Sequence, residues 1–412
     1  MKTSFCKILA LLLALCMLCS LVACNNTPAD NDIQPPVSDN GGDDGNDNGG
    51  DDGNDNSGSD VGGDQTSPTG KIKNLIFIIG DGMGKNHIEA GVLDRGSAYG
   101  FQSWQRVDVN TDSRDKNTGE LVLTDSAASA TALATGTLTL NDIVGKNPSG
   151  ESLTTIMDIA NDLGKATGVL TTDYLYGATP GGFSAHAMDR DDKKTITKTQ
   201  LQSGVNFLGG LTATIYEQSM YKSMIEESPY YFTRSLDDSA IMSKEQVMLA
   251  LDIENDKDNS VTLCDAAKTA LSYLEKDEDG FVLMIEQAYI DKRSHSNDFE
   301  GMLNRMHSLG ETVDAVMEWV GERDDTVVLV SADHETGGLS VSKTQNLGSS
   351  FAGKSGNFYY KWTTTSHTQS YVSLFVYGTT ENFGTHQTFK SNDLIKNIDI
   401  FAIMKRLVTT GE

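Results

Sequence analysis

The chain has 412 residues, a formal net charge of −26 at pH 7 and 38% hydrophobic residues. This acidic balance argues against nucleic acid as a partner, because contacts with phosphates require a basic surface. The length exceeds one average domain but lies within the range of a single large α/β unit.

Residues 1–23 predict a secretory signal. Lys2 and Lys7 precede the apolar run ILALLLALCMLCSLVA, which is shorter than the about 20 residues of a membrane-spanning helix. The run ends in LVAC, which resembles a bacterial lipoprotein cleavage box, and cleavage there would leave Cys24 to carry a lipid. An ordinary secretory signal that ends nearby is the alternative. We expect an extracytoplasmic protein, lipid-anchored to the cell membrane through Cys24.

Residues 24–70 read as the lipidated Cys24 followed by a disordered tether rich in Gly, Asp and Asn. From Asn25 to Gly70 there are eleven Asp and no Lys or Arg, a composition that repels itself and buries nothing. Its GGDDGNDN repeats lack the ligand spacing and closing Glu of an EF-hand. Cys264 is the one cysteine beyond position 24, so the mature chain is expected to have no internal disulfide.

Residues 71–412 alternate between short apolar runs and amphipathic stretches. The pattern predicts an α/β fold with a mostly parallel central sheet sandwiched between helices. Expected strands are 74–80, 165–172, 280–286, 325–332 and 371–378. Expected helices are 152–164, 262–277, about 297–321 and about 392–407.

The stretch LTDSAASATALATG, residues 123–136, contains almost no bulky side chain. One reading is a helix cap followed by a tightly packed Ala helix. The other is a helix whose first turn lets a ligand approach Ser126 closely. This stretch alone leaves both readings open.

Candidate metal ligands follow three of the expected strands. Ligands of open α/β sheets bind beyond the carboxyl ends of the strands, and close carboxylates repel one another unless cations neutralise them. The pattern therefore predicts a multinuclear metal site at these strand ends. Its residues are Asp81 after the first strand, Glu286, Asp291 and His295 around the third, and Asp333 and His334 after the fourth.

Six motifs occur in the order found in alkaline phosphatases, and the resemblance extends over roughly residues 72–407. They are IGDGMG, TDSAASATALATG, ATPGGFSAHAMDR, EQAYIDKRSH, SADHETGG and SHTQSYVSLFVYG. The resemblance implies an enzyme that hydrolyses phosphate monoesters to an alcohol and inorganic phosphate.

The resemblance also implies roles for individual residues. Ser126 would be the nucleophile that forms a phosphoserine, and Arg190, oriented by Asp125, would clamp two phosphoryl oxygens. Two Zn²⁺ and one Mg²⁺ per subunit would assist. One Zn²⁺ would bind Asp291, His295 and His367, and the second Asp333, His334, Asp81 and the Ser126 oxygen. The Mg²⁺ would bind Thr179 and Glu286, with Asp81 bridging towards it.

Several positions depart from the family pattern. Gly177 stands where many relatives have Asp or His, which puts the identity and affinity of the third metal in doubt. Gln287 and Gln369 replace common glycines and alter the expected pocket shape. Lys292 is either a surface lysine or a group that reaches the phosphate through water.

The remaining histidines are expected to play lesser roles. His186 is expected to pack or to hydrogen-bond rather than to bind a metal, and His87, His307 and His386 have no cluster of candidate ligands around them in the sequence. Residues 191–259 match the family least and are read as a lid or rim. The aromatics of YKSMIEESPYYFTR, residues 221–234, favour core packing over a leaving-group pocket.

Two other functions remain as alternatives. One is a phosphodiesterase or sulfatase on the same scaffold, and the other is a non-catalytic, surface-tethered phosphate-binding lipoprotein. The expected partners are small phosphate monoesters and a membrane, and a homodimer is a common assembly among relatives.

Overall fold

The structure is a computed structural model that describes residues 71–211, 219–251, 253, 261–344, 353–378 and 393–411, all within one compact unit, Val61–Glu412. The predicted signal peptide, Cys24, the tether and His386 lie outside the described residues. Among the helices that are described, none is both long and apolar enough to cross a membrane.

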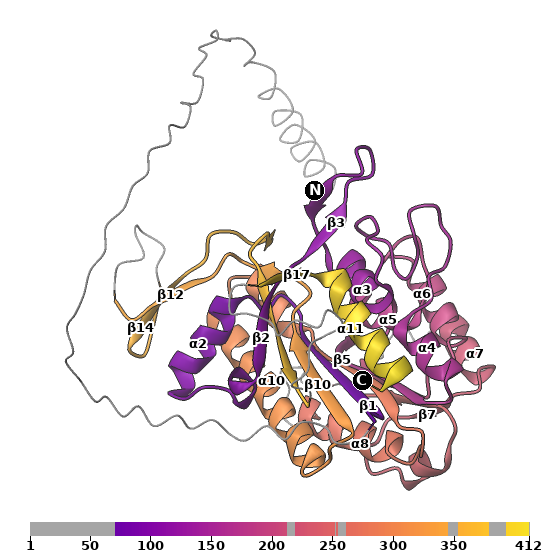
Figure 1. The fold of residues 1–412 in the computed structure, drawn as a ribbon. Helices are drawn as coiled ribbons and strands as arrows, with labels where there is room; N and C mark the ends of the chain where they lie inside the picture. The colour runs from indigo at the N-terminus through magenta and orange to yellow at the C-terminus, as the bar shows by residue number, and fades with distance from the viewer. Residues whose placement is uncertain are drawn as a thin grey trace, which may run out of the picture. The chain divides into compact units, whose positions relative to one another are not determined.

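A ten-stranded sheet forms the centre of the unit (Figure 1). Its order is β17-β2-β16-β10-β1-β9-β5-β6-β8-β7, and β16 runs against its neighbours while the other pairs are parallel. The strands are β1 (Asn74–Gly80), β2 (Gln105–Asn110), β5 (Ala166–Tyr174), β6 (Phe207–Leu211), β7 (Tyr231–Thr233), β8 (Val247–Ala250), β9 (Phe281–Gln287), β10 (Thr326–Ser331), β16 (Val372–Tyr377) and β17 (Leu394–Lys396).

Helices cover both faces of this sheet. One layer contains α3 (Ser126–Thr135), α4 (Ile156–Asp162), α5 (Ala178–Ser184) and α11 (Asn397–Thr410). The other contains α2 (Lys85–Arg95), α8 (Leu263–Leu274) and α10 (Phe299–Val320). The fold class predicted from the sequence is therefore confirmed.

Shorter elements complete the described chain. The helical ones are η1 (Gly100–Ser103), α6 (Lys193–Gln200), α7 (Ser219–Glu226), η3 (Ser239–Ser243) and α9 (Tyr289–His295). Three small sheets pair β3 (Asp112–Arg114) with β4 (Leu121–Leu123), β11 (Glu335–Thr336) with β15 (His367–Thr368), and β14 (Phe358–Lys361) with both β12 (Ser340–Ser342) and β13 (Gly353–Ser355).

The five strands expected from the sequence are present. Their apolar sequences reflect burial on both faces of the sheet. All seven residues of β1 are buried, and so are all seven of β9 and all six of β10. The predicted start of the last helix is wrong. Residues 394–396 add the edge strand β17 beside β2, and α11 begins only at Asn397.

Residues 191–259 do not consist of a lid alone. Their described parts include β6, β8 and β7, which extend the main sheet at one edge. Tyr230 is buried, and its hydroxyl donates to the backbone oxygen of Val205 at 2.6 Å. The prediction of core packing is therefore confirmed for this aromatic residue.

The small residues of α3 allow close helix packing, since all ten residues of this helix are buried. A Cβ added to Gly182 of α5 would lie 2.7 Å from the Cβ of Ala130 and 2.9 Å from its carbonyl carbon. The two readings of this stretch are thus compatible, because a closely packed Ala helix also carries Ser126 at its first turn.

Gly182→Ala is expected to lower the free energy of unfolding by about 1–3 kcal/mol, because the added methyl group overpacks the contact between α3 and α5. Chemical denaturation would measure the loss. Gly100→Ala is the matched control, since its Cβ would meet only an exposed carboxylate oxygen of Asp314 at 3.3 Å. Equal stability of the two variants would contradict the packing argument.

Candidate active site

The three clusters predicted from the sequence lie at neighbouring strand ends. Strands β9, β1 and β10 are adjacent and parallel in the sheet. Asp81 follows β1, Glu286 is the second-last residue of β9, and Asp333 comes just after β10. The carboxyl ends of parallel strands meet at one edge, so the fold gathers these carboxylates at one place.

Ser126 is the first residue of α3, and Asp125 caps this helix by accepting a hydrogen bond at 2.9 Å from the backbone amide of Ala128. The N-terminus of a helix favours a bound anion. The Ser126 Oγ lies 3.2 Å from Nε2 of His334, which comes from beyond β10. The serine hydroxyl is thus held at the helix tip against the predicted metal ligands.

Asp291, His295 and His367 form the first candidate metal cluster, with their ligand atoms within 4.8 Å of one another. Nδ1 of His295 contacts the backbone oxygen of Thr365 at 2.6 Å, and Nδ1 of His367 contacts that of Thr124 at 2.9 Å. A carbonyl only accepts hydrogen bonds, so both Nδ1 atoms donate.

The Nε2 atoms of these two histidines therefore face inward, 3.2 Å apart. They lie 3.3 Å and 3.6 Å from Oδ1 of Asp291. Two imidazole nitrogens that converge on a carboxylate, each with its other nitrogen bound to a fixed acceptor, are the arrangement of a metal site.

Asp81, Asp291 and His334 form the second candidate cluster. The Thr336 hydroxyl donates to Asp291 Oδ1 at 2.5 Å, so it can only accept from Nδ1 of His334, 3.2 Å away. This assignment leaves the lone pair of His334 Nε2 free. That nitrogen lies 3.5 Å from Oδ1 of Asp81 and 3.2 Å from Oδ2 of Asp333.

Two carboxylate oxygens close to His334 Nε2, Asp81 Oδ1 and Asp333 Oδ2, are buried without a hydrogen-bond partner. Burial, together with the charges of Asp333 and Asp291, raises the pKa of Asp81 well above its usual value. Burial is also the main cause that raises the pKa of Asp333 to about 7. Buried carboxylates left without partners fit residues that bind divalent cations.

Arg190 lies in the loop after α5 and contacts Asp125, the residue that caps the helix of Ser126. Its guanidinium donates to Oδ2 of Asp125 at 3.0 Å, and the same oxygen accepts from the backbone amide of Asp142 at 3.1 Å. The Arg190 side chain remains 34% exposed. Asp125 therefore both caps the helix of Ser126 and positions a planar cationic donor that is open to solvent.

Glu286 and Thr179 are buried next to each other, and the charge of Glu286 acts on Asp81. Thr171 donates a hydrogen bond to Oε2 of Glu286, and Thr179 also hydrogen-bonds to this side chain. Burial and the negative charge of Asp173 raise the pKa of Glu286 to about 8. Lys292 forms an ion pair with Asp173 and lies over the Tyr289 ring at 4.7 Å. The Lys292 side chain is 37% exposed, so Asp173 holds a lysine that is still partly open to solvent.

Without bound metal, the protein is expected to lose stability as the pH rises from about 6.5 to 9. Burial raises the pKa of Glu286 from 4.5 to about 8, and the hydrogen bond to Asp291 raises that of His295 from 6.5 to about 9. A group whose pKa is higher in the folded state than in the unfolded chain holds its proton more tightly when folded. The folded state therefore loses stability as the pH rises from the pKa of the unfolded chain through the pKa of the folded state.

Thermal melting of chelator-treated protein across this pH range would measure the loss, which we expect to reach at least about 1 kcal/mol. Glu286→Gln should flatten part of the profile, and added divalent metal should restore more stability at pH 9 than at pH 6.5. A profile that does not change with pH would contradict the expectation.

Sequence reasoning missed the residues that orient the predicted ligands. Thr336, Thr124 and Thr365 fix the histidine rings, and threonines give no signal of this role in a sequence. His87 is fully buried, where its Nε2 contacts Ser294 Oγ at 3.1 Å and its Nδ1 accepts from the amide of Gly84 at 3.2 Å. It thus supports the helix that carries Asp291 and His295.

The other described histidines lie apart from the two metal clusters. His186 Nδ1 hydrogen-bonds to the backbone oxygen of Gly145 at 2.7 Å, as expected from the sequence. His307 contacts the Tyr99 hydroxyl at 3.0 Å and Asp94 at 2.8 Å.

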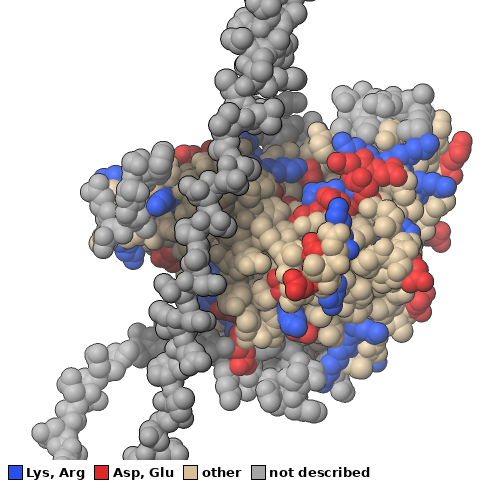
Figure 2. Space-filling view, turned by 90° about the horizontal axis from the view of Figure 1, so that it is seen from above, with Lys and Arg blue, Asp and Glu red and all other residues tan. Residues whose placement is uncertain are grey.

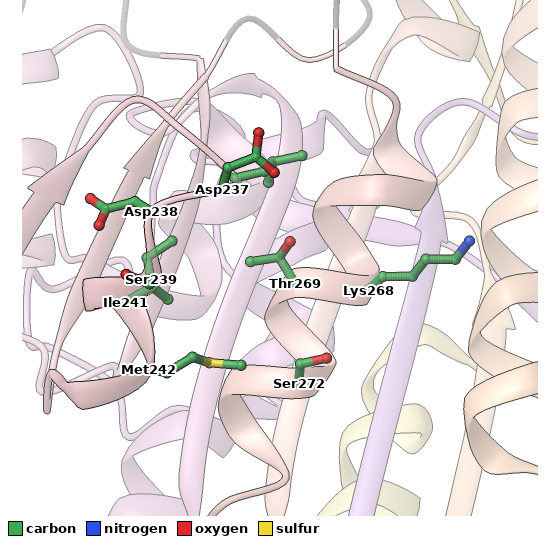
Figure 3. Close-up of a pocket in the computed structure, with 9 residues that line it drawn as sticks. Asp237, Asp238, Ser239, Ile241, Met242, Lys268, Thr269 and Ser272 are labelled. Carbon is green, nitrogen blue, oxygen red and sulfur yellow. The ribbon is translucent and has the colours of Figure 1, made fainter.

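A separate surface pocket of about 280 Å³ lies between residues 236–242 and helix α8 (Figure 3). Asp237 and Asp238 line it from the loop, and Lys268 and Thr269 line it from the helix. None of the predicted site residues lines this pocket.

A profile of the family described as alkaline phosphatase matches residues 72–220 and 244–398. The chain belongs to the alkaline phosphatase family. Alkaline phosphatase 3 of Bacillus subtilis is 30% identical over 292 residues, which cover 66% of this chain and 63% of that protein. Alkaline phosphatase of Escherichia coli is 27% identical over 330 residues, covering 64% of this chain and 70% of that protein.

Solved alkaline phosphatase structures share the fold. The enzyme from the Antarctic bacterium TAB5 superposes with a TM-score of 0.72 at 23% identity, over 82% of this chain and 98% of that chain. The matched region spans 63% of the length of the Bacillus subtilis relatives. The family resemblance read from the six motifs is confirmed.

Proposed function

We propose that the protein is an alkaline phosphatase that hydrolyses phosphate monoesters through a phosphoserine on Ser126. The observation that carries this proposal is the position of the Ser126 hydroxyl. It lies at the N-terminus of α3, 3.2 Å from His334 and beside the two candidate metal clusters. Family membership and the named relatives support the same reaction.

The residues of the chain divide the chemistry between them. Ser126 attacks the phosphorus atom, and its Oγ becomes the ester oxygen of the phosphoserine while the alcohol leaves. Arg190, held by Asp125, binds equatorial phosphoryl oxygens with two parallel donors. Attack by water on the phosphoserine then releases inorganic phosphate and restores the serine hydroxyl.

The donor sets favour two Zn²⁺ and one Mg²⁺. His295 and His367 with Asp291, and His334 with Asp81 and Asp333, are the nitrogen and oxygen ligands that Zn²⁺ prefers. Glu286 and Thr179 offer the oxygen ligands that suit Mg²⁺, and a variant of the TAB5 enzyme holds Mg in a site named M3. Bound zinc would act as a Lewis acid that favours the serine alkoxide and stabilises the leaving oxygen.

We further propose that Cys24 carries a lipid that anchors the protein outside the cytoplasm, with residues 25–70 as the tether. The LVAC sequence after a short apolar run supports this. We also propose that the protein forms a homodimer, which is a common assembly among relatives. On the uncovered part of the face drawn in Figure 2, acidic and basic side chains are interspersed. The acidic balance of the whole chain fits small phosphate esters better than nucleic acid.

Hydrolysis of a chromogenic phosphate monoester and of the matching diester tests the proposal, at alkaline pH with Zn²⁺ and Mg²⁺ supplied. We expect strong turnover of the monoester and its loss in a chelator. Preference for the diester would move the assignment to a phosphodiesterase. Bound metal without turnover of either ester would favour a phosphate-binding protein.

A further inference from the structure

Asp173, near the end of β5, is a carboxylate close to Glu286 that the sequence motifs did not assign. Strand β5 pairs with β9, and Thr171 of β5 is in register with Glu286 of β9. Asp173 follows two residues later, and its side chain is 17% exposed. Its negative charge is the strongest charge effect on the Glu286 carboxyl group. Two carboxylates from adjacent strands therefore lie close together.

Gly177 leaves room for this carboxylate. A Cβ added at Gly177 would lie 2.7 Å from Asp173 Oδ2 and 2.9 Å from the backbone oxygen of Tyr174. The φ of Gly177 is −60°, which any residue adopts, so backbone strain does not require glycine here. Lack of space requires glycine at position 177, because a side chain there would project into the volume that the Asp173 carboxylate occupies.

Lys292 engages one oxygen of the Asp173 carboxylate. Lys292 pairs with Oδ1 of Asp173, whereas Oδ2 is the oxygen nearest to Gly177. Glu286 is 1% exposed and receives hydroxyl donors. Its charge also acts on Asp81, whose Oδ1 is buried without a partner. Oxygen ligands from Asp173, Glu286 and Thr179 that lie together in this way suit a divalent cation.

We propose that Asp173 supplies the second carboxylate of the cation site formed by Glu286 and Thr179, in place of a side chain at position 177. In this arrangement Asp173 also holds Lys292 next to the site. The presence of the cation rests on the proposed function, whereas the assignment of Asp173 rests on the geometry around Gly177. The competing explanation is that Asp173 serves only as the ion-pair partner of Lys292.

Mg²⁺ binding to the zinc-loaded protein tests the proposal without any reading of activity. The Mg²⁺-dependent rise in melting temperature and the Mg²⁺ content after gel filtration would be measured. Asp173→Ala should weaken Mg²⁺ binding at least about tenfold. The double variant Asp173→Ala with Gly177→Asp should restore it, because the new carboxylate enters the space that the first substitution empties. Lys292→Met should keep most of the Mg²⁺ affinity.

Asp314→Asn, on the exposed side of α10, is the matched control and should bind Mg²⁺ as the wild type does. Wild-type affinity in Asp173→Ala, or equal losses in Asp173→Ala and Lys292→Met, would overturn the assignment. If the wild type binds no Mg²⁺ but turns over monoesters with zinc alone, the inference fails and the proposed function stands. If Mg²⁺ binding responds to the substitutions as expected but no ester is hydrolysed, the assignment of Asp173 stands and the proposed function fails.

Discussion

Ser126→Ala is expected to reduce phosphate-monoester turnover by at least about 10⁴-fold, because no other described hydroxyl occupies the tip of α3 beside His334. The fold should survive, since Ala is a good helix former and Ser126 is only one of ten buried residues in this helix. Steady-state kinetics would measure the loss. Mass spectrometry of acid-quenched enzyme would detect the phosphorylated chain in the wild type and not in the variant.

Ser243→Ala, an exposed serine far along the chain, is the matched control and should leave both measurements unchanged. The metal content of Ser126→Ala should match that of the wild type, because the histidines and carboxylates of the two clusters remain. A phosphorylated Ser126→Ala chain, or turnover within a hundredfold of the wild type, would show that another group is the nucleophile.

Asp291→Asn is expected to have the second-largest effect, because Asp291 is the one residue shared by both candidate metal clusters. Its Oδ1 lies 3.3 Å from His295 Nε2 and 3.6 Å from His367 Nε2, and it accepts the Thr336 hydrogen bond that fixes His334. We expect a loss of at least about a hundredfold in zinc affinity and a matching loss of turnover.

Zinc content after dialysis against a graded chelator series would measure this affinity. Asp298→Asn is the matched control on the same segment, since Asp298 caps α10 and pairs with Arg293 outside both clusters. Its zinc content should equal that of the wild type. Retention of both zinc ions by Asp291→Asn would contradict the view that this carboxylate links the two clusters.

The sequence by itself determined the fold class and most of the candidate site. Runs such as NLIFIIG are apolar throughout, because strands of a parallel sheet are buried on both faces. This pattern predicts which residues end each strand, and hence where Asp81, Glu286 and Asp333 lie. The motif order predicts Ser126, Arg190 and His367, although these residues are far apart in the chain.

Tertiary structure alone decided which residues support the site. Thr124, Thr365 and Thr336 fix the protonation of the histidines through backbone oxygens and a hydroxyl that only the folded chain brings near. His87 has no cluster of candidate ligands around it in the sequence, yet in the fold it is buried and contacts Ser294. The edge strand β17 was read as helix, because three residues carry too little periodicity to distinguish the two.

The proposed use of the Asp173 carboxylate in place of a side chain at position 177 shows most clearly what a sequence alone does not predict. In the sequence, Gly177 is a missing ligand and Asp173 is one more acidic residue. In the structure, the Asp173 carboxylate occupies the space beside Gly177, and its negative charge acts on Glu286. Sequence patterns predict which residues reach the edge of a sheet, because strand periodicity is local. Which side chain occupies a given volume depends on packing between segments distant in the chain, so only the folded structure decides it.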